Sequence, residues 1–221
     1  MHHEQDMRKM GSIWRLVPIT YGLMWIGSLA LAGVPPFAGY FSKDLILEAA
    51  YAAESGIGYF SFWLGATAAI MTAFYSWRLL FMTFHGSSRA DEKVIAHIHE
   101  SPKIMILPLF VLAAGSIGAG FIGYGVMVEN DDFWGQSIFV ASSHHAMENA
   151  HHVPLWVKGL PITFAAIGIA LAYVLYIRSP DMPAKISRSM KVLYYFLLNK
   201  WYFDEVYDWL IVRPIRRLGF G

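Results

Sequence analysis

Four stretches of this chain carry no charged side chain, and each is long enough to cross a lipid bilayer. They are residues 16–42, 55–77, 104–128 and 159–177. A transmembrane helix needs about 17–25 predominantly apolar residues. Only 15% of the whole chain is charged, whereas soluble globular domains carry about a quarter. These features predict an all-α integral membrane protein built as a bundle of transmembrane helices.

The distribution of Lys and Arg predicts four crossings, with the head and the tail of the chain on the cytoplasmic side. Cytoplasmic loops of membrane proteins are enriched in Lys and Arg. Basic side chains occur in the head (1–15), in the segment 85–103 and in the tail after residue 178. The segments 49–57 and 129–152 contain neither Lys nor Arg. Both of these segments are therefore expected on the outer side.

The resulting organisation has one broken transmembrane helix and three continuous ones. The predicted segments are a cytoplasmic loop 1–15, the broken helix 16–53, a helix 58–84, a cytoplasmic loop 85–103, a helix 104–128, an outer loop 129–153, a helix 154–178 and a final helix 188–221. The final helix alternates aromatic and charged residues. This pattern predicts an amphipathic helix at the membrane interface, ended or kinked at Pro214.

The break is predicted from the stretch AGVPPFAGYFSKD, residues 32–44. If 16–33 and 38–53 were separate crossings, every basic loop that follows would move to the outer side. Pro35 and Pro36 each lack a backbone donor, and Gly33 and Gly39 supply backbone freedom around them. A break at membrane depth is tolerated where protein or a wet cavity covers it, so we expect this point not to face lipid.

Lys43, Asp44 and Glu48 follow this break and are the candidate functional residues. Charged residues within transmembrane segments are costly and usually face a bundle interior or a water path. A lysine there can hold and release a proton. Asp44 and Glu48 are four residues apart and share one helix face, which suggests an acidic route toward the outer side. The alternative is that Lys43 reaches the interface or pairs with a neighbouring subunit.

The remaining candidates have simpler interpretations. Arg78 and Lys158 lie near helix ends, where long basic side chains reach the interface. The outer loop holds a histidine cluster, which we interpret as a polar loop rather than a metal site: His144, His145, His151 and His152. The chain has no cysteine and a net charge of +1, and it contains no phosphate-binding glycine motif. We therefore expect no cofactor, no metal and no redox chemistry in this chain, and no nucleic-acid partner.

At ALAGVPPFAGYFSKDLIL the chain resembles the antiporter-like membrane subunits of respiratory complex I, the NADH–quinone oxidoreductase. The stretches YSWRLLFMTFHG and NKWYFDEVYDWLIVRP are similar to the subunit L (chain 5) branch of that family. The resemblance implies inverted repeats with a broken helix in each. It also implies that Lys43 is the last lysine of the family's proton path and that Asp44 is next on the route outward. It also implies that the chain is a C-terminal part of a longer protein, cut before its lateral helix is complete.

The resemblance further implies the other membrane subunits, the lipid bilayer and protons as partners, and subunit membership in a proton-translocating enzyme. The polar, basic loops favour a bacterial inner membrane. Two alternatives share the broken-helix motif. One is the large subunit of a multisubunit Na+/H+ antiporter or of a membrane-bound hydrogenase, and the other is a fragment that transports nothing.

Overall fold

The structure is a computed structural model that describes residues 5–135, 137, 138, 141 and 145–220. The chain divides after Arg178 into two units, each described here by itself. The first unit contains five long helices: α1 (Pro18–Ala32), α2 (Ala38–Ala52), α3 (Gly56–Phe84), α5 (Lys103–Met127) and α7 (Leu155–Tyr173). Short helices α4 (Glu92–Ile95) and α6 (Ala146–Ala150) lie in its connections. The described residues form no strand.

Within the described part of the chain, three helices are long and apolar enough to cross a membrane. They are Gly56–Phe84, Lys103–Met127 and Leu155–Arg178, where a π-helical turn at Val174–Arg178 extends α7. Many of their large apolar side chains point outward, including Ile57, Ile104 and Leu155, each at least 80% exposed. Such a surface suits lipid rather than water. The predicted all-α bundle of membrane helices is confirmed.

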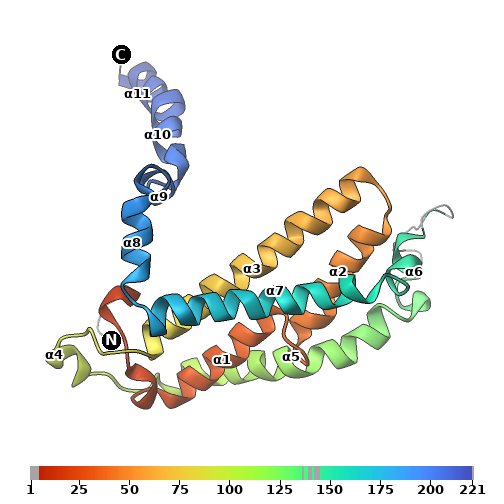
Figure 1. Ribbon diagram of the computed structural model, residues 1–221, viewed down its shortest axis with the longest axis horizontal. Coiled ribbons are helices and arrows are strands. Elements are labelled where there is room, and N and C mark those ends of the chain that lie inside the picture. Colours follow the sequence, from red (N-terminus) through yellow and green to blue (C-terminus); the bar gives the residue numbers. More distant parts are fainter. Residues whose placement is uncertain (1–4, 136, 139–140, 142–144, 221) are drawn as a thin grey trace. The chain divides into compact units, whose positions relative to one another are not determined.

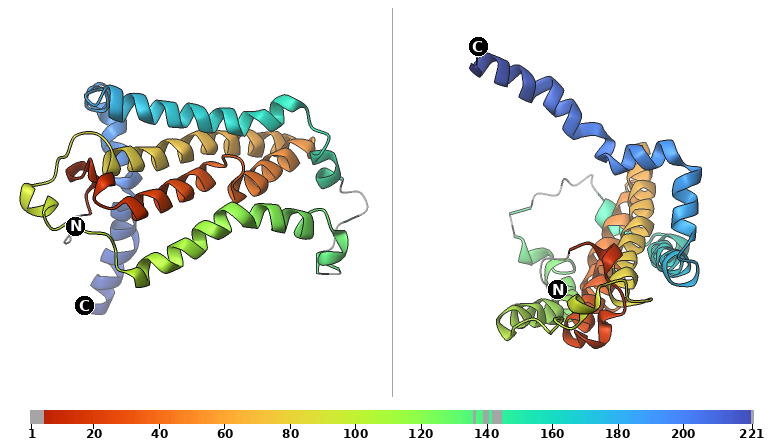
Figure 2. Two further views of the ribbon diagram at one scale, coloured as in Figure 1. Left: turned by 90° about the horizontal axis from the view of Figure 1, so that it is seen from below. Right: turned by 90° about the vertical axis from the view of Figure 1, so that its left-hand side faces the viewer.

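The pair α1 and α2 lies in the middle of this bundle. Both helices contact α3 on one side and α5 on the other. α7 packs along α3 and also contacts α2 and the end of α1. Figure 2 (left) shows the order α7, α3, α1–α2 and α5. The 29-residue helix α3 lies beside both shorter helices, so α1 and α2 follow one another end to end.

Small residues let these helices approach closely, as is common where membrane helices pack. A Cβ atom added to Gly168 of α7 would lie 2.5 Å from the Ile70 carbonyl oxygen of α3. Where α1 ends, Ala32 packs against Ala73 of α3 and Ala165 of α7, and all three are almost fully buried. The first unit is therefore held together by backbone-close contacts around the end of α1.

The second unit differs from the single helix predicted over residues 188–221. Its helices are α8 (Met182–Ser189), α9 (Lys191–Leu198), α10 (Phe203–Tyr207) and α11 (Arg213–Phe220), with a π-helical turn at Asp208–Val212. The interruption lies at Lys200, Trp201 and Tyr202, whose φ angles are 52°, 63° and 57°. Left-handed backbone at three consecutive residues cannot continue a right-handed helix.

Pro214 does not end the helix that contains it. It is the second residue of α11, directly after the π-helical turn. Proline is tolerated in the first turn of a helix because its missing N–H would have no partner there. The first alternative, that Pro214 ends the helix, is therefore wrong, whereas the second alternative, a kink at Pro214, stays a prediction.

Candidate functional site

The break between α1 and α2 is built by Gly33 and two prolines. Gly33 adopts the left-handed conformation, with φ 77°, and caps α1. Its N–H donates to the Ala30 carbonyl at 3.2 Å, and the Val34 N–H donates to the Leu29 carbonyl at 3.1 Å. Pro35 and Pro36 follow without donors of their own. The helix resumes at Ala38.

The residues of the break differ in how far this chain covers them. Gly33 is buried, whereas Pro35 and Pro36 are exposed on the surface of this chain. The expectation that the break does not face lipid stays a prediction. Proline rings have no N–H to conceal, so their exposure to an apolar environment leaves no unpaired donor.

Gly39 sets how closely α2 crosses the last turn of α1. A Cβ atom at this position would lie 1.8 Å from the Ala30 carbonyl oxygen, far inside any van der Waals distance. Only glycine leaves the required space. Lys43 is four residues further along and shares this face of α2. The close crossing thus turns Lys43 toward the end of α1.

Lys43 lies against the break. Its Cδ atom is 3.4 Å from the point that a Cβ on Gly33 would occupy. The side chain therefore runs back toward the start of α2, as helical side chains do. Its Nζ atom is buried and has no hydrogen-bond partner within the described part of the chain. A buried amino group without a partner is rare in folded proteins.

Asp44 and Glu48 point into a different space. They line a cavity of about 250 Å³ together with Tyr40, Phe41, Leu45 and Tyr124. The Asp44 side chain is only 6% exposed, and neither of its carboxylate oxygens has a hydrogen-bond partner among the residues described. Lys43 does not line this cavity, because adjacent helical residues point about 100° apart. The structure thus brings Asp44 and Glu48 together and leaves Lys43 beside them.

Tyr124 is a residue of this site that sequence reasoning missed. It lies on α5 and reaches the cavity that Asp44 and Glu48 line. Its ring lies 5.8 Å from that of Phe41, centroid to centroid. In the sequence, Tyr124 is recognisable only as a phenol near the end of a largely apolar segment. The sequence does not show which helix its side chain faces.

Beyond Tyr124, polar side chains from the loop 129–153 line a second cavity of about 830 Å³. Its polar lining includes Glu129, Glu148, His145 and His151. His145 Nδ1 lies 3.4 Å from a Glu148 carboxylate oxygen, and the Lys158 ammonium donates to the His151 carbonyl at 2.9 Å. His144, which completes the predicted cluster, lies outside the described residues. This end of the bundle is therefore polar.

The opposite end, where α1 begins and α3 ends, is called the head end. Here Glu100 accepts hydrogen bonds from the backbone N–H of Ile19 at 2.8 Å and of Thr20 at 3.4 Å, and from the Thr20 hydroxyl. Burial opposes ionisation of Glu100, but these hydrogen bonds outweigh it and hold the pKa of the carboxyl below its usual value. Glu100 thus caps α1.

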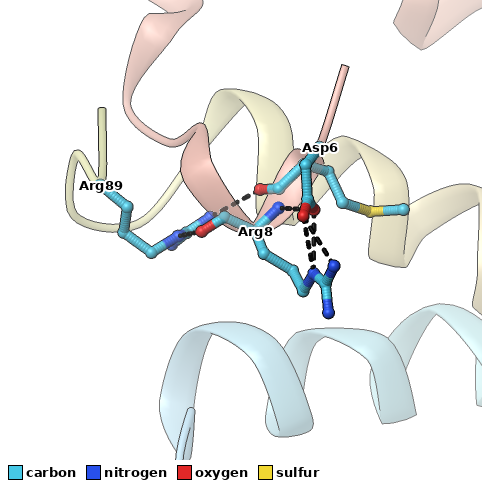
Figure 3. A network of polar contacts seen from close by, with 4 residues as sticks. Asp6, Arg8 and Arg89 are labelled. Carbon is cyan, nitrogen blue, oxygen red and sulfur yellow. Dashed lines mark hydrogen bonds and ion pairs between the residues drawn. The ribbon is translucent and has the colours of Figure 1, made fainter. Parts of the chain in front are cut away.

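A second set of contacts joins the head to the loop after α3. The Arg89 guanidinium donates to the backbone carbonyls of Met7, Arg8 and Met82, at 3.3, 3.0 and 2.6 Å. Asp6 pairs with Arg8 at 2.7 Å (Figure 3). The hydrogen bonds from Arg8 lower the pKa of Asp6 to about 2. These contacts hold residues 6–8 against the end of α3.

Comparison with known proteins agrees with the sequence resemblance. A family model described as "NADH:quinone oxidoreductase/Mrp antiporter, TM" matches residues 1–72, which include the break and all three candidate residues. NADH-quinone oxidoreductase subunit L of Rhodobacter capsulatus is 35% identical over 99% of this chain and 40% of its own length. NADH-ubiquinone oxidoreductase chain 5 of Phytophthora infestans is 41% identical over 100% of this chain and 34% of its own length.

Subunit L of Rickettsia bellii is 43% identical over 98% of the chain and 34% of its own length. The chain therefore spans between about a third and two fifths of the length of these relatives. The break, the charged residues after it and the tail all fall within the matched region. Over nearly its whole length, this chain is similar to NADH-quinone oxidoreductase subunit L and NADH-ubiquinone oxidoreductase chain 5.

Proposed function

We propose that this chain contributes part of a proton path through the membrane in NADH:quinone oxidoreductase, and that Lys43 holds and releases the proton. The observation that carries this proposal is the Lys43 ammonium, which is buried beside a break in the central helix and has no hydrogen-bond partner among the described residues. A charged group in the membrane interior costs about 2.5–3.5 kcal/mol on insertion scales and is functional by default. The relatives are named as subunits of NADH-quinone and NADH-ubiquinone oxidoreductase, which is why we propose this enzyme.

The path continues from Lys43 through Asp44 and Glu48 toward the outer loop. A proton that leaves Lys43 passes to the Asp44 carboxylate, which lines the 250 Å³ cavity together with Glu48 and Tyr124. Glu48 lies one helical turn further along α2, in the direction of the second cavity. Carboxylates and a phenol can each accept and donate a proton in turn. The break supplies backbone groups that can hold water beside Lys43.

The proposed role in a proton path also implies the partners of the chain and its orientation in the membrane. Its partners are the other membrane subunits of the complex, the lipid bilayer and protons, while electron transfer takes place in other subunits. The head, the segment 85–103 and the tail lie on the cytoplasmic side of a bacterial inner membrane, and α1 and α2 together make one of four crossings. The tail lies along the membrane surface. The Lys and Arg distribution supports this orientation.

A second candidate is cation–proton exchange, since the description of the matching family model names an antiporter beside the oxidoreductase. An exchanger would couple proton movement to Na+, whereas a redox-driven path would not. Proton uptake that is unchanged when Na+ is replaced by K+ favours the oxidoreductase. Both candidates use the same buried lysine.

The test is to replace Lys43 in the complete subunit within the assembled complex. Lys43→Met keeps the length of the side chain but cannot titrate, so proton uptake per NADH oxidised should fall severalfold while assembly persists. Lys43→Arg should also impair uptake, because guanidinium does not deprotonate in proteins. Lys103→Met, at the exposed first residue of α5, is the matched control. Full proton uptake by Lys43→Met would remove Lys43 from the path.

The two carboxylates are tested in the same assay. Asp44→Asn alone should be milder, since Glu48 shares the cavity. The double variant with Glu48→Gln should be more severe. If the double variant pumped as well as the unchanged protein, the outward route would not pass through this cavity.

A further inference from the structure

The cavity beside Asp44 lies between two helices. Its α2 side carries Tyr40, Asp44 and Glu48, which are four residues apart and share one helix face. Among the described residues that line the cavity, Tyr124 alone comes from another helix, α5. The placement of Tyr124 against α2 therefore decides what the two carboxylates meet across the cavity.

A glycine sets how closely α5 approaches α2 at this point. Gly120 of α5 is buried, and a Cβ atom on it would lie 2.3 Å from the Cδ2 atom of Phe41 and 3.0 Å from the Cα atom of Ala38. The Phe41 ring thus fills the space that any larger residue at position 120 would need. Tyr124 is one helical turn further along α5 and shares the face of Gly120. The Phe41–Gly120 contact therefore places Tyr124 against α2.

The ring of Phe41 also lies against the aromatic side chains of α5. Its centroid is 5.1 Å from that of Phe121, at an interplanar angle of 63°, and 5.8 Å from that of Tyr124, at 51°. Tilted aromatic pairs with centroids about 4.5–7 Å apart attract one another beyond the burial of their surfaces. Phe41 comes three residues before Asp44, so both side chains project from neighbouring turns of α2. Phe41 thus supports the ring of Tyr124 at the cavity that Asp44 and Glu48 line.

Proton transfer between Asp44 and Glu48 needs a group that both donates and accepts. Ionised carboxylates only accept, whereas the hydroxyl of a tyrosine does both. Neither carboxylate oxygen of Asp44 has a hydrogen-bond partner among the described residues, and ordered water can bridge polar groups that do not meet directly. Tyr40, the other phenol of the cavity, lies one turn before Asp44 and so on the side away from Glu48. Tyr124 approaches both carboxylates from the opposite helix.

We propose that Phe41 is a positioning residue that holds Tyr124 against this cavity, and that the Tyr124 hydroxyl passes the proton from Asp44 to Glu48. The phenol oxygen accepts the proton of protonated Asp44 while its own proton goes to ionised Glu48. Asp44 ends ionised, Glu48 ends protonated, and Tyr124 is neutral before and after. This inference rests on the proposed route through Asp44 and Glu48, and it adds the group that links the two carboxylates.

The test is a double-mutant cycle on proton uptake per NADH oxidised by the assembled complex. Tyr124→Phe keeps the ring that Phe41 supports but removes the hydroxyl, so uptake should fall severalfold. Phe41→Leu keeps an apolar side chain beside Gly120 but removes the supporting ring, and uptake should fall as well. Because Phe41 acts through the Tyr124 hydroxyl, adding Phe41→Leu to Tyr124→Phe should lower uptake no further. Phe110→Leu, at an exposed ring of α5, is the control and should change uptake little.

A second pair of variants tests the contact itself. Gly120→Ala would place its Cβ atom against the Phe41 ring, so less complex should assemble, or the complex that forms should show reduced proton uptake. Gly123→Ala, also on α5, has nothing within 4 Å of its Cβ position and should change neither quantity. If Gly120→Ala matched the unchanged protein in both quantities, the Phe41–Gly120 contact would not position Tyr124.

The outcomes separate this inference from the proposed function. Full proton uptake by Tyr124→Phe or by Phe41→Leu would overturn the inference. A further loss on adding Phe41→Leu to Tyr124→Phe would also overturn it, because Phe41 would then act independently of the hydroxyl. If the double variant of Asp44→Asn and Glu48→Gln loses uptake while Tyr124→Phe keeps it, the route stands and the transfer through Tyr124 is rejected. If that double variant pumps fully, the outward route itself is rejected.

Discussion

Proline is accommodated in two different ways in the apolar helices of this chain. Pro108 and Pro161 lie inside α5 and α7, both of which continue past them. Pro35 and Pro36 lie instead in a gap of five residues between α1 and α2. A single proline removes one helical hydrogen bond and can be absorbed near a helix start. Two in succession, after a left-handed Gly33, prevent the helix from continuing.

The broken helix and the continuous helices also differ in where their charged residues lie. The broken helix carries Lys43, Asp44 and Glu48 in its middle. The continuous helices α3, α5 and α7 carry charged residues only toward their ends: Arg78, Lys103 and Lys158. Continuous helices satisfy their own backbone and need nothing from their surroundings. The break and the charged residues therefore occur together in one helix, as the proposed proton path requires.

The largest effect is expected where the break depends on glycine. Gly39→Ala would place its Cβ atom 1.8 Å from the Ala30 carbonyl oxygen, and α2 would have to move away from α1. Overpacking lowers the stability of a protein by about 1–3 kcal/mol and occasionally more. We expect the loss of stability in Gly39→Ala to lie at the upper end of this range. Little assembled complex should form. Gly27→Ala is the control, since nothing lies within 4 Å of its Cβ position. Equal amounts of assembled complex on a native gel would contradict the close crossing.

The second effect concerns the prolines themselves. Replacing both Pro35 and Pro36 with Ala restores two backbone donors and lets α1 and α2 approach one continuous helix. Assembly should persist, and proton uptake per NADH oxidised should fall by about half or more as the break loses its open backbone groups. Pro161→Ala, within the continuous α7, should change proton uptake little. A Pro161→Ala variant as impaired as the double variant would show that the break has no special role.

Much of this arrangement could be predicted from the sequence. Uncharged runs located the membrane helices because their length and apolarity are set by the bilayer. The break was recognisable because Gly33, Pro35 and Pro36 act locally, through their own backbone chemistry. The roles of Lys43, Asp44 and Glu48 stay a prediction, which the structure makes specific by turning them toward different spaces.

Other features could not be predicted, because they depend on packing between distant segments. Tyr124 reaches Asp44 across more than 70 residues of sequence, and Glu100 caps a helix that begins about 80 residues earlier. No local pattern announces either contact. The interruption at Lys200, Trp201 and Tyr202 was missed for a different reason. None of these residue types favours left-handed backbone, and the hydrogen bond of 2.8 Å from the Asn199 amide to the Tyr202 hydroxyl is visible only in the folded chain.

The smallest expected effect comes from removing the N-terminal cap of α1, in the broken helix, or of the continuous helix α3. α3 is capped locally, by the Ser55 hydroxyl that accepts from the Gly58 N–H at 3.0 Å. α1 has no cap of its own at Val17 and depends on Glu100 from the following loop. Removing either cap should cost about 0.5–2 kcal/mol. Glu100→Gln and Ser55→Ala should therefore lower the thermal stability of the purified complex by similar amounts at pH 7.

Only the Glu100 cap should respond to acid. Its pKa is lowered in the folded protein, so its contribution is fully present above the unfolded value of about 4.3. That contribution is lost as the pH falls through the lowered folded value. As the pH falls below about 4.3, Glu100→Gln should lose less stability than the unchanged protein, whereas Ser55→Ala should follow it in parallel. If the Glu100→Gln curve also ran parallel, Glu100 would not cap α1 as a carboxylate, and α1 would be held by packing alone.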